Sequence, residues 1–76
     1  MDMLTKARAY EIAAAWHDTQ ARTFCEMAHD EPRIDGATRT RAASAARHHA
    51  GSAAALRLAA SNLFRLALNG EQHDDR

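Results

Sequence analysis

Two histidines are the residues with the clearest potential for chemistry. His17 and His49 each sit in the middle of an otherwise apolar helical stripe. Imidazole nitrogens bind Zn²⁺ and other transition metals, and neutral imidazoles can also hydrogen bond to each other and fix how two helices pair. Two ligands fall short of the three or four that a metal site normally needs. A hydrogen-bonded pair is therefore the main prediction, and a metal-binding bundle through His17 and His49 is the alternative.

A row of arginines in the second half of the chain is the other group with chemical potential. At about 100° per residue, four of them fall within about 80° of one another around a helix. Such a stripe can follow phosphates, which suggests an RNA- or DNA-binding regulator as an alternative function. The zero net charge and the lack of interleaved aromatic residues count against it. The arginines can instead cover the apolar stripe and meet the acidic first helix. They are Arg39, Arg47, Arg57 and Arg65.

The sequence offers little for catalysis. It contains no phosphate-binding loop, no glycine-rich nucleotide turn and no zincin motif. Cys25 is expected to be a small buried hydrophobic residue rather than a nucleophile. We therefore expect a protein that is not an enzyme and that needs no cofactor.

Length and composition restrict the class of protein. The 76 residues suffice for one small domain, and no apolar run approaches the roughly 18–20 residues of a membrane span. A single cysteine excludes an intramolecular disulfide and fits a cytoplasmic location. Acidic residues predominate in 1–31 and arginines in 32–70, so two segments packed side by side would attract each other.

The pattern of apolar residues predicts an all-α helical hairpin over residues 1–70. The first helix should span about 3–28, with Asp2 or Thr5 as its N-cap and with Trp16 among its inward residues. Residues 29–36 form the connection, in which Asp30 or Asp35 caps the next helix. The second helix should span about 37–69 and end with Gly70 in a left-handed conformation, followed by a polar tail, 71–76.

The short connection predicts that the two helices are antiparallel neighbours. With the pivot near Arg33, residues face each other when their numbers sum to about 66. His17 then lies opposite His49, and alanine layers on either side, such as Ala13 with Ala53, would let the backbones approach closely.

One hairpin cannot cover all the apolar residues. Leu58 and Leu66 point away from the stripe of the second helix, and Leu4 and Ile12 lie outside the arc of the first. These residues predict a homodimer that forms a four-helix bundle, and the competing interpretation is an apolar patch for a different protein. The predicted function is non-enzymatic macromolecular binding, as a protein-binding adaptor or an inhibitor of a larger complex.

Overall fold

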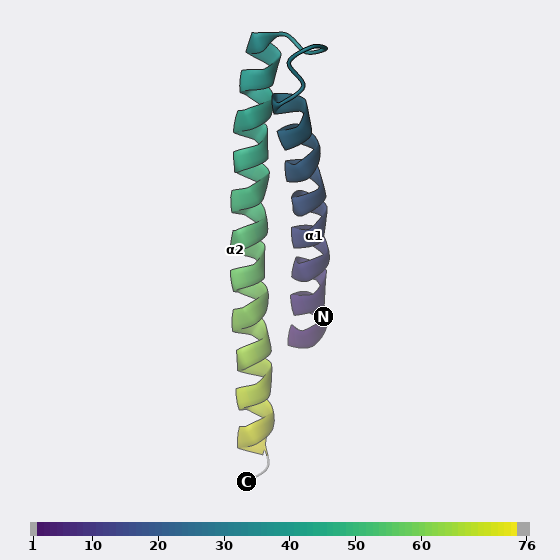
Figure 1. Cartoon of the computed structure of the whole chain (residues 1–76). Helices are drawn as coiled ribbons and strands as arrows, with labels where there is room; N and C mark the ends of the chain where they lie inside the picture. Colours follow the sequence, from purple (N-terminus) through teal and green to yellow (C-terminus); the bar gives the residue numbers. More distant parts are fainter. Residues whose placement is uncertain (1, 75–76) are drawn as a thin grey trace.

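The chain forms two long helices that pack against each other, as predicted. In the computed structural model, which describes residues 2–74, α1 spans Met3–Ala28 and α2 spans Gly36–Asp74. They run antiparallel, side by side, joined by a short connection (Figure 1). The described part of the chain contains no strand. The molecule is a rod of 64 × 14 × 13 Å.

Aspartate side chains cap both helices at their start. Asp2 Oδ1 accepts a hydrogen bond from the backbone N–H of Thr5 at 2.7 Å, and Asp35 Oδ1 accepts one from Thr38 at 2.8 Å. These backbone hydrogen bonds are the main reason that the pKa of each aspartate lies below its usual value. At each helix, one of the two predicted capping residues was therefore correct: Asp2 for α1 and Asp35 for α2.

The predicted end of the second helix was wrong. α2 continues through Gly70 to Asp74, and no described glycine has a positive φ. Glutamate and glutamine are good helix formers, and no proline follows Gly70 to stop the helix. Residues 71–74 of the predicted polar tail are thus helical, whereas 75–76 lie outside the described residues.

Alanines line the seam between the helices at intervals of seven residues. Ala7 and Ala14 of α1 and Ala53 and Ala60 of α2 are almost fully buried, as is Ala42. Larger, half-buried residues alternate with them, among them His17 in α1 and Leu56 in α2. This alternating spacing of three and four residues is that of a coiled-coil seam, and the small alanine side chain permits close helix approach.

The contact arc of α1 is narrower than its sequence pattern suggested. Trp16, predicted to face inward, is 55% exposed, and Cys25, predicted to be buried, is exposed. Ala14 is the fully buried alanine, whereas Ala13 is half-buried. A single partner helix covers only the residues that directly face it, so residues at the edges of the apolar arc stay in contact with solvent.

α2 is longer than α1 and extends beyond the N-terminal end of α1 (Figure 1). Because His17 faces His49, the first residues of α1 lie opposite about residue 63 of α2. Leu66 and Leu68 therefore belong to a stretch of α2 that α1 does not cover, and both are exposed. Over the described residues, neither helix is long and apolar enough to cross a membrane.

Candidate functional site

The predicted histidine pair lies at the middle of the seam. His17 Nδ1 and His49 Nδ1 are 2.8 Å apart, which is a hydrogen-bond distance and confirms the predicted pairing. Such a contact needs one ring to donate its Nδ1–H and the other to accept through an unprotonated Nδ1. The pair is half-buried, and Ala14 and Ala53 in the neighbouring layer hold the two backbones close. The hydrogen bond therefore depends on the alanine seam beside it.

Aromatic rings surround His49 on several sides. The Phe24 ring is stacked on it, with centroids 5.7 Å apart and an angle of 4° between the planes. Trp16 reaches across the seam from α1 and meets His49 edge-on at 5.8 Å and His17 at 5.0 Å. His48 approaches from the same helix at 5.7 Å. One half-buried imidazole thus joins aromatic residues of both helices into one cluster.

This environment disfavours a charge on His49. Burial is the largest cause that lowers its pKa below the ordinary value of 6.5, and the charges of His17 and His48 act in the same direction. If both members of the pair were protonated, each Nδ1 would carry a hydrogen, and two donors would face each other. A charge on His49 is therefore opposed both by its burial and by the Nδ1–Nδ1 hydrogen bond.

The histidine pair alone does not make a conventional metal site. Its two Nδ1 atoms are directed at each other, whereas metal ligands direct their lone pairs at a shared ion. Within residues 2–74, no group of three or more His, Cys, Asp or Glu side chains is arranged to hold a metal ion. Metal binding through His17 and His49 therefore stays an untested alternative that would need further ligands.

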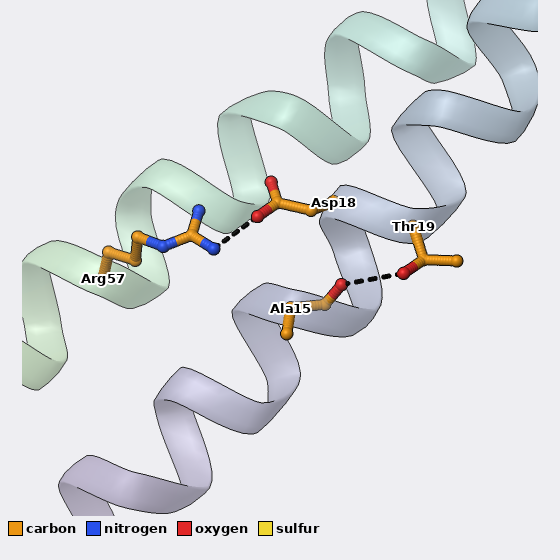
Figure 2. A network of polar contacts seen from close by, with 4 residues as sticks. All are labelled: Ala15, Asp18, Thr19 and Arg57. Atoms are coloured by element: carbon orange, nitrogen blue, oxygen red, sulfur yellow. Dashed lines mark hydrogen bonds and ion pairs between the residues drawn. The ribbon is translucent and has the colours of Figure 1, made fainter.

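An ion pair joins the two helices on one flank of the hairpin. The Arg57 guanidinium donates to Asp18 Oδ2 (Figure 2). This hydrogen bond is the main cause that lowers the pKa of Asp18 and raises that of Arg57. It confirms that a basic residue of the second helix meets the acidic first helix. In the same view, Thr19 donates to the carbonyl oxygen of Ala15, 3.2 Å away, within α1.

Two other arginines of the predicted stripe also bond within the hairpin. Arg65 donates to Asn62 Oδ1, and Arg39 Nε donates to the Ile34 carbonyl oxygen at 3.1 Å. Arg47 is exposed. Of these arginines, only Arg57 bonds to α1 within the described part of the chain, whereas Arg39 and Arg65 make local bonds near their own positions in the chain. Their use for nucleic acid stays a prediction.

The four predicted interface residues are exposed but do not share one face. Ile12 precedes the buried Ala14 by two residues, and Leu58 precedes the buried Ala60 by two residues, so each points about 160° away from the seam. Ile12 therefore lies at the outer edge of α1, and Leu58 lies at the outer edge of α2. Leu4 is near the seam at the start of α1.

Leu66 lies on the uncovered end of α2. It lines a surface depression together with Asn62, Arg65 and Asn69.

Trp16 was missed as a surface residue, although its position four residues after Ile12 would have placed the two side by side on the outer part of α1.

The comparisons with known proteins do not assign this hairpin to a family: no family model, no curated protein and no solved structure matches the chain.

Proposed function

We propose that this chain is a non-enzymatic protein-binding module that self-associates as a homodimer of hairpins in a four-helix bundle. In this role it is an adaptor, or an inhibitor that occupies the surface of a larger complex. One observation carries the proposal: the described core consists of alanines, whereas large apolar side chains such as Ile12, Trp16 and Leu58 are exposed. Exposed apolar side chains mark a binding surface where they lie together, as Ile12 and Trp16 do four residues apart on α1.

The energetics of the core support association. Fully burying a large apolar side chain stabilises a fold by about 1.5–3 kcal/mol, and an alanine contributes much less. No large side chain of the described residues is fully buried, and the chain has no disulfide. Small domains without such stabilisation generally depend on a partner. A second hairpin would supply the missing apolar contacts.

The outer edge of α2 around Leu58 is the surface that we assign to a further protein. Leu58 is 63% exposed and points away from α1. In a bundle of two hairpins that pack flank to flank, this outer edge would stay accessible. It is therefore suited to an apolar contact with a protein other than a second copy.

Photo-crosslinking in the cells that make the protein tests this function. A photoreactive residue in place of Leu58 should give a discrete product that is heavier than the homodimer. The same probe at Glu26, an exposed residue of α1, serves as the control. Equal patterns from both positions, or no product heavier than the homodimer from Leu58, would contradict the assignment of Leu58 to a protein partner. Native mass spectrometry of the purified chain tests the homodimer itself.

A further inference from the structure

The two flanks of the hairpin differ sharply in charge. Trp16 and Asp18 are two residues apart in α1, so they point about 160° away from each other and mark opposite flanks. The Asp18–Arg57 ion pair spans one of them, which we call the ion-paired flank. Helical geometry places further charged residues on this flank, among them Glu11, Arg22 and Arg47.

The opposite side, the Trp16 flank, has no lysine, arginine, aspartate or glutamate in its central part. Lys6 and Arg41 stand near its two ends. Trp16 itself reaches the His49 ring at 5.8 Å, which shows that this flank is formed by both helices. Its central part consists of Ala13, Trp16, Gln20, His48, Ser52 and Ala55.

The accessible surface of the chain is larger than a compact monomer would show. It measures 5576 Å², against about 4,600 Å² expected for a compact protein of 8.4 kDa. The excess of roughly 1,000 Å² is close to the roughly 800 Å² that each partner buries in a standard stable interface. One flank of a 64 Å rod, covered by another rod of the same kind, is a contact of suitable length.

A two-fold interface places the same surface patch on both sides, so the patch must be complementary to itself. Like charges that meet at such an interface oppose association, and the central part of the Trp16 flank contains none of the four charged residue types. The small side chains of Ala13, Ser52 and Ala55 allow close approach, and Trp16 provides a large apolar contact. On the ion-paired flank, by contrast, Asp18 and Arg57 already bond to each other between α1 and α2.

We propose that a second copy of this chain docks on the Trp16 flank, which makes this flank the homodimer interface. The inference rests on the proposed self-association and names the surface that performs it. Docking covers the exposed side of Trp16 and shields the His17–His49 pair from solvent on that side. It leaves Leu58 at the outer edge and the ion-paired flank facing solvent.

The fluorescence of Trp16, the only tryptophan in the chain, tests this proposal on the unmodified protein. The purified chain is diluted stepwise, and its mass is followed by light scattering while the emission maximum is recorded. We expect the emission to shift to longer wavelength over the same concentrations at which the dimer dissociates. A dimer that dissociates without any change in emission uses another surface, which overturns this inference and leaves the proposed self-association intact.

Two neighbouring alanines provide a matched pair of variants. Ala54 and Ala55 are both exposed, and they lie about 130° to either side of the midline of the seam, Ala55 on the Trp16 flank and Ala54 on the ion-paired flank. Ala55→Glu introduces a charge that meets its own copy in the dimer, so the dimer dissociation constant should rise at least about tenfold. Ala54→Glu should change it less than about twofold, because that side chain stays in water.

The remaining outcomes of this experiment separate the two proposals. Circular dichroism checks that both variants stay helical. An equal effect of the two substitutions, or a larger effect of Ala54→Glu, overturns the assignment of the interface. A chain that is monomeric at every concentration refutes the self-association and this inference together, and the Leu58 crosslinking then tests binding to another protein by itself.

Discussion

The alanine seam makes a quantitative prediction for the substitution Ala14→Leu. Ala14 is 0% exposed and lies in the layer next to the His17–His49 hydrogen bond. Leucine at this position places an isobutyl group where the two helices are in close contact. Extra carbon atoms in a tightly packed interior typically destabilise a protein by about 1–3 kcal/mol.

This loss of stability converts into a change in melting temperature. The entropy of unfolding is about 2.1 cal/mol/K per residue, or roughly 160 cal/mol/K for 76 residues. A destabilisation of about 1–3 kcal/mol therefore lowers Tm by about 6–19 °C. Thermal unfolding measures this change in Tm when it is followed by circular dichroism at about 222 nm, where the signal reports helix content. The wider seam should also break the His17–His49 hydrogen bond, which the ¹⁵N chemical shifts of the imidazoles report.

The neighbouring residue provides the control. Ala15 is exposed, and Ala15→Leu adds the same group to the solvent side of the same helix. Exposed substitutions usually change stability by no more than about 0.5 kcal/mol, or about 3 °C here. If Ala14→Leu melts within about 3 °C of Ala15→Leu and keeps the imidazole signals unchanged, the helices do not pack closely at Ala14, and the reasoning from the seam is refuted.

Three further predictions concern His49, Gly70 and the arginines of α2. Because the folded chain lowers the pKa of His49, it binds this proton more weakly than the unfolded chain does, so stability should be full above about pH 6.5 and decrease as the pH falls below it. Melting curves from pH 8 to pH 5 should show this decrease, and His49→Gln should weaken it while His29→Gln should not; a flat profile would contradict the prediction. Gly70→Ala should stabilise the fold by up to about 1 kcal/mol and so raise Tm by up to about 6 °C, because α2 continues through this residue and a Cβ there meets nothing within 4 Å; a lower Tm would indicate a left-handed helix end instead. If protein rather than nucleic acid is the partner, the chain and its Arg47→Glu, Arg57→Glu double variant should bind oligonucleotides equally weakly, and strong salt-dependent binding that the double variant loses would favour the nucleic-acid alternative.

The sequence was sufficient to predict the hairpin because its signals are local and repeated. A helical period, capping aspartates and a short connection containing Pro32 define two antiparallel helices without reference to anything else in the chain. The midpoint of the connection also set the register of the two helices, which placed His17 opposite His49. Register follows from connection length because each helical residue advances the chain by a constant amount of about 1.5 Å.

Other features depended on how much of each helix its partner covers. Periodicity identifies an apolar arc, but it does not report the width that one neighbouring helix buries, so Trp16 and Cys25 were placed inside although they are exposed. The end of α2 was likewise misjudged, because a glycine near a helix end adopts a left-handed conformation only where the chain turns, and the residues after Gly70 continue the helix.

The histidine pair shows most clearly which properties the sequence determined and which the tertiary structure determined. The sequence by itself determined that His17 faces His49, since the spacing of the stripes and the length of the connection suffice for that. Only the tertiary structure decided that the alanine seam brings the two Nδ1 atoms within 2.8 Å and that Phe24 and Trp16 enclose the His49 ring. The physical reason is that distance and burial depend on side chains from both helices at once, whereas periodicity is a property of each helix alone.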